Sequence, residues 1–229
     1  LKQLAHNWVR KSNAALAAMV RSWVLTAVLV LQARAATQTF AARRDADDAS
    51  VAVCVAGEAG MAFQRAMVHR SLKHRLLDGL GAKHVDIFAA VDTANPAEAE
   101  ATRLLLTKAL GARSAFVSAA GEHPAKSRCR PDMRSVDFLA RIGSADRLLQ
   151  EWEAVENCYK QILIAEESNG RQYDWLLRVK PDVMWHGRMD PLSTFSPTVV
   201  SVAQQGHEMF LCPRVHADVA FRGALARDC

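Results

Sequence analysis

The sequence predicts an α/β domain with a mostly parallel sheet flanked by helices, and two observations carry this prediction. Short runs of apolar, β-branched residues alternate with longer stretches of helical periodicity, which is the pattern of strand–helix–strand units. About half of the 229 residues are apolar and 23% are charged, which suits one globular domain with a substantial core. We expect right-handed crossovers between the parallel strands.

The first strands and helices are predicted between residues 51 and 118. The run 51–56 is apolar throughout and ends at Gly57, as expected for a strand covered on both faces. The elements that follow are a helix over 62–80 ended by glycines, a strand over 85–91, a helix over 97–110 opened by Pro96, and a strand over 115–118. This β-α-β-α-β order is typical of a parallel sheet.

The longest helix is predicted after an irregular section over 119–143. Ser144 would cap it, Asn169-Gly170 would end it, and a strand over 173–179 would follow. Its apolar positions recur at spacings of four and three residues, as on the buried face of a helix. They are Leu148, Trp152, Val155, Tyr159 and Ile162.

Residues 1–35 are predicted to form a signal peptide or a signal anchor. Five basic and no acidic residues accompany the apolar run 23–31, and Ala33-Arg34-Ala35 has the form of a cleavage site. An amphipathic transit peptide is the alternative. The leader predicts the secretory pathway (the lumen of the endoplasmic reticulum or Golgi) or secretion, with membrane contact only through an uncleaved N-terminal segment.

Residues 36–50 are then a linker or stem, and residues 51–229 the α/β domain, which we expect to be truncated at its C-terminus. Outside the leader the sequence holds 24 basic and 24 acidic residues. No basic stripe remains to indicate a nucleic-acid partner.

The cysteines and histidines form no metal-binding motif. The five cysteines include no CxxC pair, which argues against a structural zinc site. One or two disulfides could form in an oxidising compartment, but Cys54 and Cys158, which lie inside regular elements, are expected to be plain buried residues rather than bridge partners. The absence of HExxH, GxxxxGK[ST] and GxSxG patterns argues against zinc hydrolases, P-loop enzymes and α/β-hydrolases.

Three charged residues end the last predicted strand in alternation, namely Arg178, Lys180 and Asp182. Strand geometry would point all three to one side. Burying such charges unpaired costs several kcal/mol, whereas the carboxyl edge of an α/β sheet is where ligands bind. An arginine and a lysine there can neutralise a diphosphate, and a carboxylate can hold a divalent cation.

The segment Tyr-Asp-Trp-Leu-Leu-Arg-Val-Lys-Pro-Asp-Val-Met-Trp over 173–185, with the Trp-bearing helix before it, resembles an uncharacterised plant and algal glycosyltransferase-like family. Related enzymes of the GT-A type show a similar Tyr-Asp-x-x-x-Arg-x-Arg-Pro-Asp run. The loop Gly57-Glu-Ala-Gly60, the segment 86–88 and the segment 207–214 also fit that family, so the resemblance covers most of 51–223.

The resemblance implies a GT-A fold, a nucleotide-sugar donor, a glycan or protein acceptor and a divalent cation, usually Mn²⁺. Asp182 would be the metal ligand, and Glu208, with Asp190 as second choice, would be the catalytic base. The residues that would bind the donor are Gly57, Gly60, Arg65, Arg178, Lys180 and Trp185.

Two departures from the family pattern bear on activity. Gly60 stands where such proteins usually have an arginine, and His207-Glu208 replaces Asn-Asp. A catalytically silent secreted domain that binds a glycan or a protein is therefore the alternative function. An enzyme of the same fold that uses another activated donor is a third.

The individual residues also have plainer interpretations. Arg178 and Asp182 would otherwise pair with surface charges, and Gly57 and Gly60 would only form a turn, since one Gly-x-x-Gly is a weak phosphate signal. Trp185 would pack in the core rather than stack on a sugar.

Overall fold

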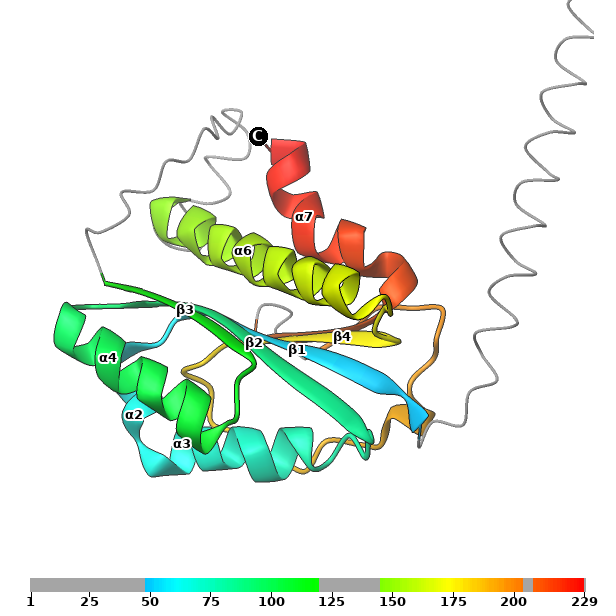
Figure 1. Ribbon diagram of the computed structural model, residues 1–229, viewed down its shortest axis with the longest axis horizontal. Helices are drawn as coiled ribbons and strands as arrows, with labels where there is room; N and C mark the ends of the chain where they lie inside the picture. Colours follow the sequence, from blue (N-terminus) through cyan, green and yellow to red (C-terminus); the bar gives the residue numbers. More distant parts are fainter. Residues whose placement is uncertain (1–47, 120–144, 204–207, 229) are drawn as a thin grey trace, which may run out of the picture. The chain divides into compact units, whose positions relative to one another are not determined.

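The computed structural model describes residues 48–119, 145–203 and 208–228 (Figure 1). The predicted leader, most of the linker, the Ser144 cap and nearly all of the irregular section 119–143 lie outside the described residues. Within the described residues, no helix combines the length and the apolar character needed to cross a membrane.

A six-stranded sheet forms the centre of the domain, in the order β3-β2-β1-β4-β6-β5. Its strands are β1 (Ser50–Glu58), β2 (His84–Thr93), β3 (Ser114–Ala119), β4 (Trp175–Val179), β5 (Ser201–Val202) and β6 (Met209–Pro213). The first four are parallel, and β6 runs antiparallel to both β4 and β5. The prediction of a mostly parallel α/β sheet is therefore confirmed.

Helices cover both faces of this sheet (Figure 1). One face carries α2 (Gly60–Gln64), α3 (Ala66–Ser71), α4 (Pro96–Leu104) and the π-helical turns η2 (Leu72–Leu77) and η3 (Leu105–Ala109). The other face carries α6 (Ala145–Asn169) and α7 (Ala217–Asp228). The 3₁₀ turns η4 (Leu192–Thr194) and η5 (Arg214–His216) lie in the connections.

The core consists of two apolar layers that share β1. Val51, Val53 and Val55 face the layer under α2, α3 and α4, whereas Ala52 and Cys54 face the layer under α6. Such alternation follows from the two-residue period of a strand. The expectation that this strand is covered on both faces is confirmed.

The helix predicted over 62–80 is divided. Arg65, between α2 and α3, has extended backbone angles (φ −69°, ψ 127°). Phe63 and Val68 are both buried on the same core layer, yet a continuous α-helix would set residues five apart about 140° from each other. The break at Arg65 brings both side chains to the core.

The helices α4 and α6 agree with the predicted patterns. Asn95 Oδ1 accepts a hydrogen bond from the backbone N–H of Glu98 (3.0 Å), and Pro96 is in the first turn of α4. Along α6, Val155, Tyr159 and Ile162 are fully buried, as the spacing of apolar residues indicated.

The elements after β4 had not been assigned from the sequence. β6 is a short strand whose five residues are all buried, and its pairing with β4 and the edge strand β5 extends the sheet beyond the predicted parallel part. Phe221 of α7 is buried against Tyr159 and Phe210, with ring centroids 5.1 and 4.9 Å apart. α7 therefore packs on α6 and on the end of the sheet.

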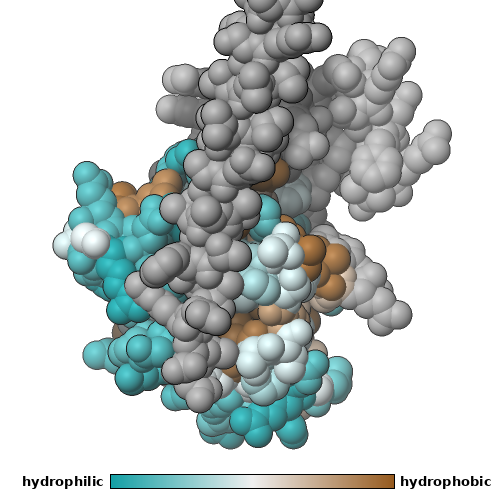
Figure 2. Space-filling model, turned by 90° about the vertical axis from the view of Figure 1, so that its right-hand side faces the viewer, coloured by the Kyte–Doolittle hydropathy of each residue, from teal (hydrophilic) through white to brown (hydrophobic). Residues whose placement is uncertain are grey.

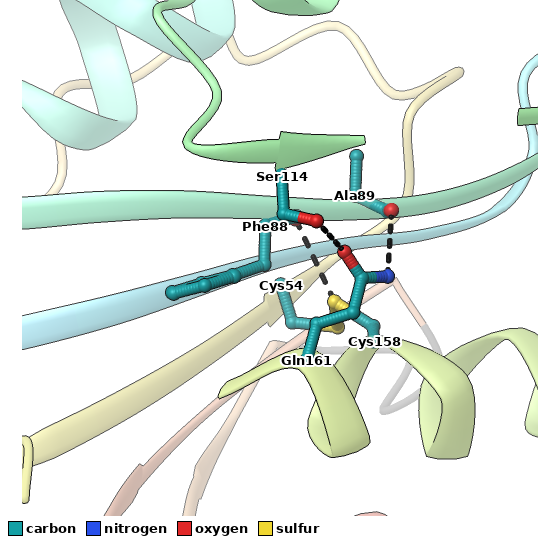
Figure 3. Close-up of a disulfide and its surroundings, with 6 residues drawn as sticks. All are labelled: Cys54, Phe88, Ala89, Ser114, Cys158 and Gln161. Carbon is teal, nitrogen blue, oxygen red and sulfur yellow. Dashed lines mark hydrogen bonds between the residues drawn. A yellow bond between two sulfur atoms is a disulfide. The ribbon is translucent and has the colours of Figure 1, made fainter. Parts of the chain in front are cut away.

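A disulfide joins Cys54 of β1 to Cys158 of α6 (Figure 3). The expectation that these two cysteines are plain buried residues is wrong, because the packing of α6 against β1 brings their Cα atoms to 5.9 Å, a normal bridging distance. Gln161 lies next to the bridge and donates to the carbonyl oxygen of Ala89 (3.1 Å). The bridge and this hydrogen bond hold α6 on the sheet.

Replacing Cys158 with alanine is expected to lower the free energy of unfolding by about 2–5 kcal/mol, since the bridge closes a long loop in the unfolded chain. Guanidinium unfolding with and without a reductant measures the effect. Cys212→Ala is the control, because Cys212 is buried and free and its loss should leave the effect of the reductant unchanged. Wild-type stability that is insensitive to reductant would contradict a structural bridge.

Candidate functional site

The four parallel strands end at one edge of the sheet, where the strand order also reverses. From β1 the chain proceeds to β2 and β3 on one side, and from β4 it proceeds to β5 and β6 on the other. The carboxyl ends of β1 and β4 therefore flank a topological switch point. Open α/β sheets bind ligands in the crevice outside this point.

A cavity of about 610 Å³ lies at this edge. Among the described residues it is lined by the ends of β1, β2 and β3, by the segment after β4 and by the first half of α6. Its polar side chains include Glu58, Asp92, Ser118, Glu153, Lys180 and Asp182. The volume is in the range of small-molecule sites.

Glu151 of α6, which lines the cavity, pairs with two cations at the end of β4. Arg178, whose side chain is only 4% exposed, donates from Nη2 to Glu151 Oε1, and Lys180 Nζ lies 3.4 Å from Glu151 Oε2. Burial lowers the pKa of Arg178, and the neighbouring Glu151 opposes that change. Arg178 and Lys180 therefore point to one side of β4, as predicted, and both meet a carboxylate that the sequence had not indicated.

Gly57 gives the end of β1 a backbone conformation that favours glycine. Its φ of +121° is a conformation that residues with a Cβ rarely adopt. A Cβ there would lie 3.7 Å from Glu151 Cγ and 3.9 Å from Pro181 Cδ. The backbone at Gly57 thus runs directly beneath the Glu151 side chain.

Two further carboxylates lie on the far side of the cavity. Asp92 Oδ1 accepts a hydrogen bond from Ser118 Oγ, which ties the ends of β2 and β3 together. Burial first, and then the nearby charge of Asp92, raise the pKa of Glu153 above its ordinary value. With Glu58, Glu151 and Asp182, the described part of the lining carries five carboxylates and one lysine.

The carboxylates of the cavity can supply only part of the ligand set of a hard divalent cation. No group of three potential ligands that could hold a metal ion occurs among the described residues. However, Asp182 is exposed and lines the cavity. Mg²⁺ and similar ions are commonly bound through one or two carboxylates together with substrate phosphates. The donor set fits that arrangement, with Asp182 as the protein ligand.

The structure brings some of the predicted site residues together. Lys180 and Asp182 line the cavity, and Gly57 and Arg178 lie behind it against Glu151. Glu208 precedes β6, and its carbonyl oxygen accepts from the backbone N–H of Lys180 (2.9 Å). The antiparallel course of β6 thus places Glu208 beside the edge, although its side chain does not line the cavity.

The other predicted residues do not line the cavity. Gly60 (φ +50°) begins α2, and Arg65 is exposed between α2 and α3. Trp185 packs against the core layer under α2–α4 and donates its backbone N–H to Ser71 Oγ (2.9 Å). Asp190 follows Met189, whose backbone N–H donates to the carbonyl oxygen of Arg75 in η2 (2.8 Å).

Sequence reasoning missed most of the cavity's carboxylates. Glu58 is the last residue of β1 and Asp92 the second-last of β2, and a carboxylate at the end of a parallel strand is a usable signal. Glu151 and Glu153 lie on α6, where acidic residues at helical spacing usually indicate a solvated face. Only the packing of α6 on β4 shows that Glu151 meets Arg178.

A second cavity, of about 400 Å³, lies at the amino edge of the sheet. It includes Asp86, which accepts from Tyr173 Oη and from Arg113 Nη1 (2.9 Å). Figure 2 shows the molecule from the side on which the parallel strands begin, and hydrophilic residues predominate among those coloured. The polar groups around Asp86 already bind one another, so this cavity is the weaker candidate.

These features define an α/β domain with a ligand-sized cavity at the switch point of its sheet, with several carboxylates in the described part of the lining. The chain belongs to the family described as "Domain of unknown function (DUF7796)", which matches residues 46–215. No curated protein matches the sequence.

Glu151→Gln is expected to destabilise the protein by about 3–5 kcal/mol, because it leaves the buried Arg178 charge without its carboxylate. Arg178→Met should cost less, since Glu151 keeps Lys180 as a partner. Chemical unfolding of both variants measures the difference. If both variants lose the same free energy of unfolding, the cost of leaving the buried Arg178 charge unpaired is not the dominant effect.

Glu153→Gln is expected to raise the melting temperature slightly at pH 7, by about 1–2 °C, since the group is partly solvated. The raised pKa of Glu153 means that ionisation costs more in the folded than in the unfolded protein. The gain should be present above the folded pKa and disappear as the pH falls below the ordinary glutamate value. Glu167→Gln, an exposed change on the same helix, is the control and should show no such dependence.

Proposed function

We propose that the domain is a metal-dependent glycosyltransferase that moves a sugar from a nucleotide-sugar donor to a hydroxyl of a glycan or protein. The observation that carries the proposal is the cavity at the switch point, which Lys180 and Asp182 enter from the end of β4. The resemblance of residues 173–185 to glycosyltransferase-like proteins supports the same function. The predicted leader supports action in the secretory pathway.

In this proposal the residues after β4 bind the diphosphate. Lys180 Nζ would contact its oxygens, and Asp182 would hold the divalent cation. When bound, the cation supplies Lewis-acid stabilisation of the leaving diphosphate. Before the donor binds, Lys180 is paired with Glu151. The rim of carboxylates at Asp92 and Glu153 would hold sugar hydroxyls by hydrogen bonds.

An inverting transfer also requires a carboxylate that accepts the acceptor proton. The resemblance makes Glu208 the first candidate, and the backbone bond from Lys180 to Glu208 keeps it next to the diphosphate side of the edge. Asp190, the second candidate, lies along η2. Asp190 is not among the described residues that line the cavity.

One observation favours the alternative of a catalytically silent domain. Arg178 and Lys180 are both engaged by Glu151, and the remaining described lining is acidic. A cavity of this charge could bind a glycan without binding a nucleotide. Nucleotide binding therefore separates the two functions.

Thermal-shift titration with UDP and with GDP, each with and without Mn²⁺, tests the proposal. One nucleotide is expected to raise the melting temperature by about 5 °C at saturating concentration, and only with Mn²⁺. Asp182→Asn should abolish the shift, whereas Asp78→Asn, in an exposed pair with His74, should retain it. A folded protein that responds to neither nucleotide would favour the silent glycan-binding domain.

A further inference from the structure

We propose that Glu151 is an internal counter-ion: its carboxylate pairs with Arg178 and Lys180 and thereby prevents a diphosphate from binding without a divalent metal. The inference rests on the proposed function, because it concerns the same diphosphate site. Glu151 would be the residue that makes a divalent metal obligatory for diphosphate binding.

The first step is that Arg178 is not available to a ligand. Its side chain is 4% exposed and donates to Glu151. Its Nε is buried without a hydrogen-bond partner among the described residues. Breaking the contact with Glu151 would leave a buried charge, which is costly, so Glu151 stays with Arg178 in every state of the site.

The second step is that Lys180 is the exchangeable cation. It is the one cation among the described residues that line the cavity, and its Nζ lies 3.4 Å from Glu151 Oε2, a looser contact than the one to Arg178. A lysine ammonium on a flexible stem can turn from one anion to another. An incoming phosphate must therefore compete with Glu151 for Lys180.

The third step is the charge of the cavity. Apart from Glu151, which is paired with Arg178 and Lys180, the described lining includes Asp92, Glu153 and Asp182, so a free diphosphate meets carboxylates of its own sign. A divalent cation bound to the diphosphate removes most of that repulsion and gives Asp182 a partner. Glu151 thus shifts the preference of the site from the free anion to its metal complex.

The double variant E151Q/R178M removes the internal counter-ion without leaving a buried unpaired charge. Replacing both members of a buried ion pair is commonly tolerated, and circular dichroism checks the fold. Inorganic pyrophosphate, with and without Mn²⁺, is the probe, and calorimetric titration is the measurement. Pyrophosphate avoids any dependence on the nucleotide base.

Wild-type protein should bind pyrophosphate only with Mn²⁺, whereas the double variant should bind it without metal at least about tenfold more tightly than the wild type. The matched control is Arg178→Met, which keeps Glu151 on Lys180 and should gain nothing. Glu167→Gln removes an exposed charge at the other end of α6 and should also gain nothing.

Metal-free binding by the wild type, or a double variant without gain, would overturn the inference. Equal gains in Arg178→Met and in the double variant would overturn it as well, because Glu151 would then not be the competitor. If pyrophosphate behaves as expected but neither UDP nor GDP binds with Mn²⁺, the proposed transferase function fails and the counter-ion role of Glu151 stands.

Discussion

The burial of β1 on both faces is the constraint on which the rest of the domain depends. Its residues from Val51 to Ala56 are fully buried, so each face requires its own layer of helices and each edge requires a paired strand. The pairing with β2 on one side and β4 on the other creates the point where the strand order reverses. The cavity at the carboxyl edge is thus a consequence of how the central strand is covered.

The parallel half of the fold could be predicted because its sequence signals are local. Continuous apolar runs gave β1 to β4, and the three- and four-residue spacing gave α6. The break at Arg65 could not be predicted, since it follows from where Phe63 and Val68 must pack on the sheet. β6 does form an apolar run, but its antiparallel direction depends on pairing with β4, which is a property of the assembled sheet.

The candidate site was predictable only where residues follow strands. Arg178, Lys180 and Asp182 were found from their alternation at the end of β4, whereas Trp185 and Asp190, a few residues later, lie away from the cavity because the chain turns towards η2. Glu151 gave no signal of its own. The role of this helical carboxylate depends on its contact with the buried Arg178. That contact joins residues on different elements, so the sequence pattern of α6 alone does not indicate it.

The bridge between Cys54 and Cys158 also sets the tolerance of α6 to insertions. Cys158 follows Glu151 by two helical turns, so both residues face the sheet and both are fixed to it. A single inserted residue between them would turn Glu151 about 100° away from Arg178 while the sulfurs stay in place. Insertions and deletions among relatives should therefore be absent between Glu151 and Cys158 and occur instead in the loops before and after α6.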